Sequence, residues 1–304
     1  MSIPLIFDAH VHFFSCEVIG FYARQSPELK GLPDPVTAAV ERLGIELPPA
    51  EPEALARRWV GELDRFGVQK AVLFGSAPGE QRSIARAVQA YPARFVGFQV
   101  VNPMVPNLRE VLEDIVTCGL RGLLLFPAMH GYFVDDPACR PVYEAAWEYR
   151  LIVFVHLGRL KIAIRDKLGV VGRIEERYVD PSRLIDVLRG YEDVAFIVPH
   201  FGNGHLTSLV TLAQGVNNLY LDTSSSNSWM RTTPECPNLE AVFRTALDAA
   251  ALGPRHILFG TDSTVFPRGW RRDIFDSQLD VMNRLRLSSH EIQAILYDNL
   301  ARLL

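Results

Sequence analysis

The feature that most constrains the fold is a repeated alternation of a short apolar segment with a longer segment of helical periodicity. The apolar segments are rich in β-branched and aromatic residues, so they predict buried strands. They lie at residues 5–10, 68–74, 95–100, 122–126, 152–156, 194–200, 219–223 and 257–260. The segments that predict helices have apolar residues every three or four positions and lie at 53–66, 81–90, 108–118, 141–149, 181–190, 205–214 and 239–250.

Eight hydrophobic strands that alternate with helices predict a parallel sheet covered by helices. Eight is also the number of strands that closes into a TIM (β/α)8 barrel, so an α/β barrel is the expected fold class. An open, doubly wound sheet is the alternative. The chain has 304 residues, of which 48% are hydrophobic, and barrels of this length form one domain, here expected to span residues 1–304.

Two connections are longer than usual and follow strands 1 and 5. The first, 13–52, has five prolines before its last residue, and we expect an excursion with one short helix near 36–43. The second, 157–180, is basic. Loops that follow barrel strands surround the active site, so both connections are expected to have a functional role. Three basic side chains of the second loop are candidates for binding a substrate carboxylate, with a solvated loop as the alternative: Arg159, Lys161 and Arg165.

Charge and cysteine content restrict the class of partner. The formal net charge is −4 and no run of Lys or Arg occurs, so we expect a small-molecule substrate and neither nucleic acid nor a membrane surface as partner. The four cysteines have no CxxC spacing, which predicts reduced thiols in a cytoplasmic protein. The sequence predicts no signal peptide, and no segment reaches the ~18 to 20 apolar residues of a membrane helix.

Histidines mark the end of the first predicted strand. His10 and His12 are two positions apart, so their side chains are expected to point to the same side, into the mouth of the barrel. Asp8 has the same parity, and we expect it to orient one of the two imidazoles. A pair of histidines alone is a weak signal for a metal site.

Three further strands end in residues of the same chemical kind. His156 is the first polar residue after strand 5, His200 follows strand 6, and Asp262 follows strand 8. The ends of parallel barrel strands meet at one face, so these side chains should converge with the first pair. Three imidazoles and one carboxylate suit Zn²⁺ or a similar divalent ion with a coordination position left for water.

The motifs FDAHVH, VFVHLG, VPHFGNGH, YLDTSSSN, LFGTDS and ILYDNLARLL resemble the amidohydrolase superfamily over essentially the whole chain. They look most like its amidohydrolase-related (amidohydrolase 2) branch, which includes aminocarboxymuconate-semialdehyde decarboxylase and aromatic-acid decarboxylases. The resemblance implies a homodimer and a metal site. Its ligands would be His10, His12, His156 and Asp262, with His200 and Asp262 as the catalytic acid and base.

The resemblance also bears on the number of ions. Binuclear relatives carry a bridging Lys or Glu at the end of strand 4, whereas this chain has Leu124 and Leu125 there. One divalent ion is therefore implied, Zn²⁺ in the first place, with Mn²⁺, Fe²⁺ and Co²⁺ as alternatives.

Other polar and aromatic residues at strand ends have weaker signals. Asp222 competes with Asp262 as the acidic ligand, but a cap or a support for a ligand is the favoured interpretation. Ser224 to Ser226 lack a nucleophile-elbow pattern and indicate a turn. Four residues that follow strands 4 and 7 are expected to face the substrate: His130, Tyr132, Asn227 and Trp229.

These features favour a metal-dependent hydrolase that cleaves a C–O or C–N bond in a small carboxylated lactone, ester or amide. A metal-dependent decarboxylase of an unsaturated or aromatic acid is the nearest alternative. A noncatalytic metal-binding module is the third, and the open coordination position argues against it.

Overall fold

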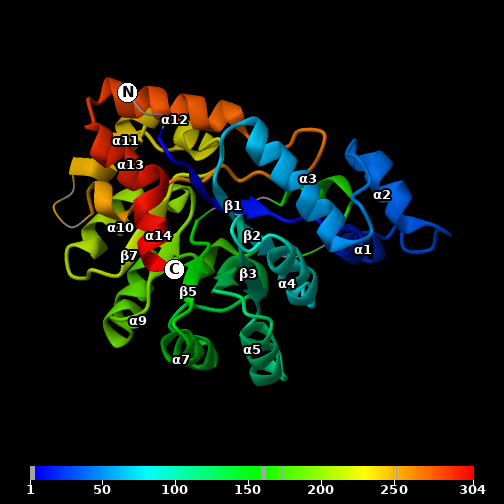
Figure 1. Cartoon of the computed structure of the whole chain (residues 1–304). Helices are drawn as coiled ribbons and strands as arrows, with labels where there is room; N and C mark the ends of the chain where they lie inside the picture. The colour runs from blue at the N-terminus through cyan, green and yellow to red at the C-terminus, as the bar shows by residue number, and fades with distance from the viewer. Residues whose placement is uncertain (1–3, 159–161, 171, 173, 249, 251) are drawn as a thin grey trace.

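The computed structural model describes residues 4–158, 162–170, 172, 174–248, 250 and 252–304. In these residues eight parallel strands pair in the order of the sequence (Figure 1). The strands are β1 (Phe7–His12), β2 (Lys70–Gly75), β3 (Phe95–Val101), β4 (Gly122–Leu125), β5 (Ile152–Val155), β6 (Phe196–Val198), β7 (Leu219–Asp222) and β8 (Ile257–Leu258). Backbone bonds from Ala9 to Phe259 (2.8 Å) and from Asp262 to His10 (2.9 Å) join the two edges. The predicted TIM barrel is confirmed.

Helices cover the outside of the barrel and extend from its mouth. They are α1 (Cys16–Gln25), α2 (Pro35–Leu43), α3 (Pro52–Arg65), α4 (Gln81–Ala90), α5 (Leu108–Thr117), α6 (Pro127–His130), α7 (Arg140–Tyr149), α8 (Ala163–Lys167), α9 (Leu184–Gly190), α10 (Leu206–Ala213), α11 (Leu239–Asp248), α12 (Arg272–Arg284), α13 (Ser289–Gln293) and α14 (Asn299–Leu303). Among the described residues, none of the helices has the length and apolar character needed to cross a bilayer.

Alternation along each strand divides the apolar residues between two cores. On β2, Phe74 points into the barrel, where its ring lies 4.9 Å from that of Phe154 and 5.6 Å from that of Phe98. Its neighbour Leu73 points outward and packs in the core between the strands and the helices, which also holds the fully buried Trp59 of α3. Burial on both faces explains why the strands are continuous hydrophobic runs in the sequence.

The first strand contains an irregularity that decides where its polar residues point. Its register with β2 shifts between Asp8 and Val11, which is the mark of a β-bulge. The rings of His10 and Phe74 are 4.6 Å apart inside the barrel. Asp8 points to the outer core, where it accepts a hydrogen bond from Trp270 Nε1 (2.7 Å). The prediction that Asp8 shares the direction of His10 is wrong, because the bulge changes the parity between them.

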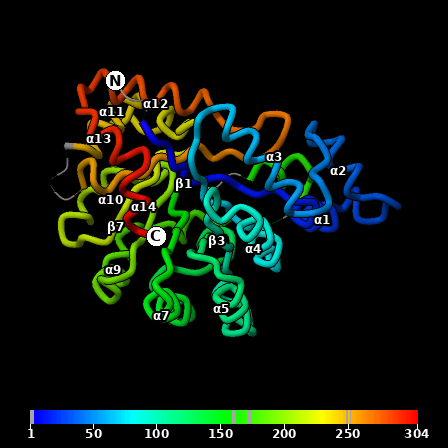
Figure 2. Tube along the Cα trace, in the orientation of Figure 1, coloured from blue at the N-terminus to red at the C-terminus, as the bar shows by residue number. Residues whose placement is uncertain are grey.

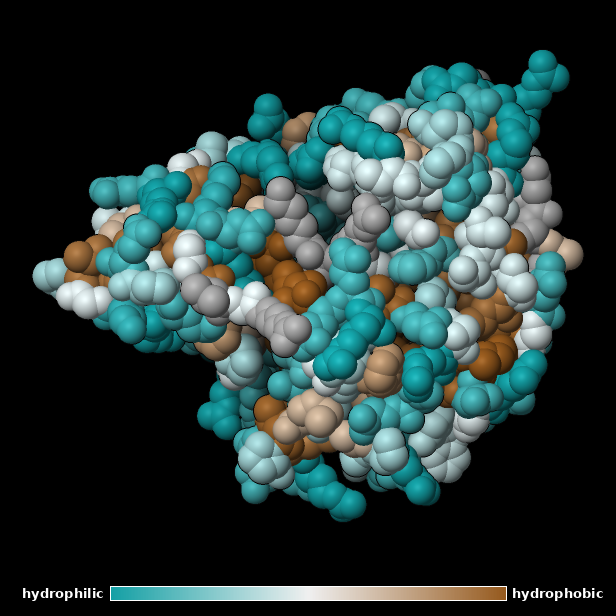
Figure 3. Space-filling view, turned by 180° about the vertical axis from the view of Figure 1, so that it is seen from behind, coloured by the Kyte–Doolittle hydropathy of each residue, from teal (hydrophilic) through white to brown (hydrophobic). Residues whose placement is uncertain are grey.

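The connection after β1 also differs from its prediction. It forms two helices, α1 and α2, instead of one. These helices pack against α8 in an apolar cluster that includes Tyr22, Leu43 and Ile164 and is separate from both barrel cores. We call α1, α2 and α8 the cap. Figure 1 shows α1 and α2 projecting to one side of the barrel, and the view from behind shows hydrophobic surface in the hollow beside them (Figure 3).

The chain ends on the opposite side of the strands from the cap. The ring of Tyr297 lies 5.7 Å from that of Phe7, the first residue of β1, and Leu300 of α14 belongs to the interior cluster. The final helices therefore cover the amino-terminal end of the barrel, as the tube in Figure 2 shows. Every cysteine in the chain is a free thiol.

Candidate active site

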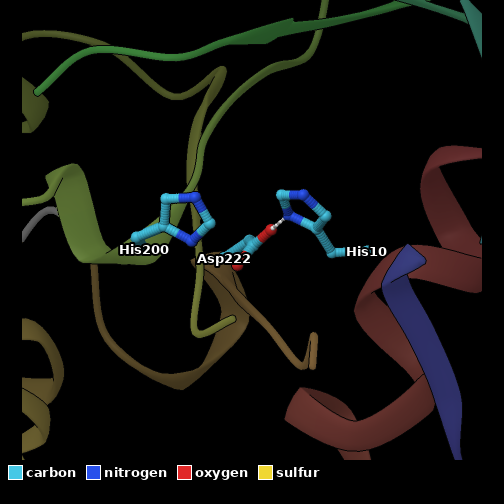
Figure 4. A group of neighbouring side chains, drawn as sticks. All are labelled: His10, His200 and Asp222. Atoms are coloured by element: carbon cyan, nitrogen blue, oxygen red, sulfur yellow. Dashed lines mark hydrogen bonds and ion pairs between the residues drawn. The ribbon is translucent and has the colours of Figure 1, made fainter. Parts of the chain in front are cut away.

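The two histidines of β1 are each held by a partner on the δ nitrogen. His10 Nδ1 lies 2.7 Å from Asp222 Oδ2 (Figure 4), and His12 Nδ1 lies 2.7 Å from Ser76 Oγ. The two Nε2 atoms then approach each other to 3.3 Å. A partner on one ring nitrogen fixes the tautomer and leaves the other nitrogen as a ligand, which is the usual arrangement of metal-binding histidines.

Asp262 completes this group from the end of β8. Its Oδ1 lies 3.4 Å from His12 Nε2 and 3.8 Å from His10 Nε2. Ligands about 2.1 Å from a tetrahedral ion are separated by about 3.4 Å, so these three atoms have the spacing of ligands to one ion. Burial alone would raise the pKa of Asp262, but the hydrogen bond with His12 and the nearby histidines hold it well below its usual range.

His156 and His200 lie beside this group. Their rings are 5.1 Å apart, and both residues line the same cavity as His10 and Asp262. Burial, together with the neighbouring histidines, lowers the pKa of His156 to about 3, which keeps its ring neutral. Its Nδ1 is buried and has no hydrogen-bond partner among the described residues. A neutral, buried imidazole with an unpaired nitrogen fits a metal ligand.

A serine joins His10 to His200. Ser224 Oγ lies 3.0 Å from His10 Nδ1 and 2.8 Å from His200 Nδ1, and the two rings stack with centroids 5.2 Å apart. Asp222 accepts a hydrogen bond from the backbone of Ser224 at 2.5 Å while it contacts His10. Asp222 is thus in the supporting position that the sequence favoured. Ser224, interpreted as a turn residue, also contacts the histidines.

The space around this group has two parts. One cavity of about 330 Å³ lies under the cap and is lined mainly by apolar side chains, among them Phe14, Tyr22 and Phe126; we call it the apolar lobe. A second cavity of about 340 Å³, the polar lobe, is lined by Ser225, Ser228 and other polar residues. Both lobes have the same three residues in their walls: His156, His200 and Asp262.

The residues predicted to face the substrate after β7 have different positions. Trp229 lines the polar lobe, and its Nε1 donates to Asn227 Oδ1 at 3.0 Å. The amide of Asn227 donates to the carbonyls of Thr223 and Ser225, each at 3.2 Å. Both ends of the Asn227 side chain are therefore engaged within its own loop, whereas Trp229, although only 6% exposed, is part of the lining of the lobe.

Three of the residues predicted after β4 and β5 are not part of either lining. Tyr132 is buried in the outer core, and the ring of His130 stacks on it with centroids 6.4 Å apart. Burial and the charge of Arg165 on α8 lower the pKa of His130 to about 4. Arg159 and Lys161 lie outside the described residues. The structure does not bring His130, Tyr132 or Arg165 into the wall of either lobe.

Other lining residues were not singled out by the sequence. Ser76 holds His12, and two arginines after β8, Arg268 and Arg271, line the apolar lobe together with Lys167 of the cap. In the sequence, only their position after barrel strands indicated that these residues could line the active site.

Comparison with known proteins agrees with this architecture. The family model "Amidohydrolase" matches residues 7–304. A TIM-barrel protein from Bordetella bronchiseptica is 19% identical, with a TM-score of 0.66 over 98% of this chain and 97% of that one. The 5-carboxyvanillate decarboxylase from Sphingomonas paucimobilis is 18% identical, with a TM-score of 0.64 over 99% of this chain and 99% of that one. A probable 2-pyrone-4,6-dicarboxylic acid hydrolase from Acinetobacter baumannii is 15% identical, with a TM-score of 0.59 over 98% of this chain and 98% of that one.

A comparison with curated protein sequences gives no significant match. The family match nevertheless covers nearly the whole chain and confirms the predicted resemblance, and with it the prediction of an enzyme. The chain belongs to the amidohydrolase family.

Proposed function

We propose that the protein is a metal-dependent hydrolase that cleaves a C–O or C–N bond in a small carboxylated substrate. The observation that carries the proposal is the position of His156, His200 and Asp262 in the shared wall of two lobes. A hydrolase must hold the substrate on both sides of the bond it breaks. A decarboxylase releases CO₂ and needs little space for the departing part.

The proposed ligands of a single divalent ion are His10, His12, His156 and Asp262. The spacing of the first two imidazoles and the carboxylate and the unpaired nitrogen of His156 support this set. Such an ion supplies Lewis-acid activation of water, whose pKa falls toward ~7. Zn²⁺ suits these ligands. Mn²⁺ is the first alternative, because a 5-carboxyvanillate decarboxylase from Novosphingobium aromaticivorans and a dihydroxybenzoic acid decarboxylase from Polaromonas were crystallised with manganese.

The residues of the chain would provide the proton transfers. Asp262 and His200 lie at the junction of the lobes, and we assign them the proton of the attacking water and its delivery to the leaving group. Asp222 and Ser224 would hold His10 and His200 in fixed orientations during this exchange, through the contacts described above.

Nonoxidative decarboxylation is the second candidate. Two observations favour it: several similar structures are decarboxylases of aromatic acids, and the apolar lobe has the aromatic side chains Phe14 and Phe126 in its wall. Such a lobe could accept a flat ring whose carboxylate faces the histidines.

One experiment separates the two reactions. Protein loaded with Zn²⁺ or Mn²⁺ is incubated in H₂¹⁸O with 2-pyrone-4,6-dicarboxylate, 5-carboxyvanillate, 2,6-dihydroxybenzoate and a panel of carboxylated lactones, esters and amides. We expect ¹⁸O in the product, no CO₂, and loss of turnover in His10→Ala, while His290→Ala, a change at an exposed histidine of α13, retains it. Release of CO₂ instead establishes the second candidate. Turnover that survives His10→Ala in a folded variant, or no reaction with any substrate, overturns the proposal.

A further inference from the structure

A guanidinium without a carboxylate partner lies at the rim of the apolar lobe. Arg268 follows β8 six positions after Asp262 and is part of the lining of the lobe. Its Nη2 donates to the hydroxyl of Thr264. Within the described part of the chain, no carboxylate oxygen lies within 4.0 Å of its nitrogens.

Two other arginines show the carboxylate pairing that Arg268 lacks. Arg86 contacts Glu51 and Glu53, and Arg272, only four positions beyond Arg268, contacts Asp276 at 2.6 Å. Arg268 therefore retains donors that these two arginines give to acidic neighbours. Among the described residues Arg109 and Arg231 also have no carboxylate partner, but they lie outside the lining of the lobe, whereas Arg268 is part of it. An arginine with free donors in the wall of a cavity is suited to bind an anion there, because its planar group matches a carboxylate.

The surroundings of Arg268 make the rim positive. Arg271 lines the same lobe, and its charge contributes, after burial, to the lowered pKa of Arg268, so the two guanidiniums are close. Only Arg271 has a carboxylate partner, Asp273 at 2.5 Å. Lys167 adds a third cation from the cap side of the lobe. The carboxylates of Asp262 and Asp273 also act on Arg268 and offset part of this positive charge, but Asp273 is already paired with Arg271. The three cations favour an anion at the rim.

The loop that carries Arg268 is held in place from several sides. Gly269 N donates to Val265 O at 3.0 Å, and Trp270 N donates to Glu62 Oε1 at 3.1 Å. Gly269 has φ +64°, a backbone conformation that favours glycine, and a Cβ there would lie 2.2 Å from Glu62 Oε1 and displace this carboxylate from Trp270 N. Arg271 N donates to Ser263 Oγ at 3.0 Å. A preorganised loop loses little entropy when its arginine binds a ligand.

We propose that Arg268 binds a carboxylate of the substrate and so determines its class: a small acid with a compact apolar or aromatic body. The body lies in the apolar lobe, the carboxylate lies at the rim on Arg268, and the bond to be cleaved lies at the junction beside Asp262. This assignment rests on the proposed function, and it adds a residue after β8 to the cations of the loop after β5 as a source of acid recognition.

The test measures binding without turnover, so its outcome is independent of which reaction the enzyme performs. Benzoate, 2,6-dihydroxybenzoate and 4-hydroxy-3-methoxy-5-nitrobenzoate, each paired with its neutral carboxamide, are titrated by calorimetry into wild-type, Arg268→Gln and Arg272→Gln proteins with Mn²⁺. The last variant removes a neighbouring arginine that is outside the lobe and serves as the matched control. Thermal unfolding verifies that each variant is folded.

We expect Arg268→Gln to weaken binding of the carboxylates by about tenfold to a hundredfold, the usual contribution of a charged hydrogen-bonded pair, and to leave the carboxamides unchanged. Arg272→Gln should bind like the wild type. Three results would overturn the assignment: equal affinity of Arg268→Gln and wild type for the acids, an equal loss for acids and amides, or a wild type that binds none of the acids. If Arg268 distinguishes the acids from the carboxamides as expected, but the protein hydrolyses none of the candidate substrates, only the proposed function is refuted.

Discussion

Replacement of the buried carboxyl group of Glu80 should change how stability depends on pH. Glu80 is 1% exposed and links the cap to the site. Its Oε1 accepts a hydrogen bond from Ser15 Oγ (2.8 Å), which caps α1, and its Oε2 accepts one from Ser76 N (2.7 Å). Ser76 in turn contacts His12. Burial raises the pKa of Glu80 from 4.5 to about 8, and the hydrogen bonds from Ser15 and Ser76 offset only part of this effect.

The direction of the pH effect follows from the raised pKa. Below pH ~4.5 the carboxyl group is protonated in both folded and unfolded chains, so it contributes no pH dependence. Between pH ~4.5 and ~8 the unfolded chain loses the proton and the folded chain keeps it, which favours unfolding as the pH rises. The slope approaches 1.36 kcal/mol per pH unit, so the loss is about 2.5 kcal/mol from pH 5 to pH 7.

Glu80→Gln removes the titrating group and keeps its shape. The free energy of unfolding is measured by urea denaturation at pH 5, 6 and 7 in the presence of a chelator, for wild type, Glu80→Gln and Glu41→Gln, a change at an exposed position of α2. The difference between Glu80→Gln and wild type should rise by about 2.5 kcal/mol in favour of the variant over this range. A difference that stays constant would refute the assignment of a raised pKa to Glu80.

Four further changes test other contacts. Asp222→Asn should weaken metal affinity by about 10- to 100-fold, because the ligand that it orients loses its charged partner; calorimetry with Zn²⁺ that gives an unchanged affinity would contradict this. Ser76→Ala removes a single hydroxyl contact and should cause a smaller loss in the same assay. Trp59→Ala should cost about 3–5 kcal/mol in urea unfolding, because the indole fills the outer core, and a cost under about 1 kcal/mol would contradict that packing. Arg165→Gln should raise the pKa of His130 above about 4 in an NMR titration, since the cation lowers it; a pKa that stays the same or falls would show that the two are not coupled.

The strands were predictable because they are buried on both faces and therefore appear as continuous apolar runs. The first helix of the cap was not. The segment Cys16–Gln25 contains Val18, Ile19, Phe21 and Tyr22, residue types that lose side-chain freedom in a helix, and it lies in a connection rich in proline. Its helical form depends on packing against two other helices. The first, α2, follows after a turn, and the second, α8, is distant in the sequence.

The residues at strand ends were predictable as a group because barrel topology brings them together. Their supports were not. Ser76 is 64 positions from the histidine it holds, and Ser224 is 214 positions from His10, so no local pattern connects them. The role of Arg268 was also not predictable from the sequence. Two more arginines, Arg271 and Arg272, follow it closely, and only the fold shows that, among the described residues, these two have carboxylate partners and Arg268 has none.

The bulge in β1 explains how one strand can serve both faces of the barrel. Without it, Asp8 and His10 would share a direction; with it, His10 points to the site while Asp8 accepts hydrogen bonds from Thr261 N (3.1 Å) and Trp270 Nε1 (2.7 Å). Asp8 therefore anchors the segment that carries both Asp262 and Arg268, on the outer side of the same strand that places His10. The cap has an apolar cluster of its own, so the hydrogen bonds of Asp8 that hold Asp262 and Arg268 lie outside the packing that forms the cap wall of the apolar lobe.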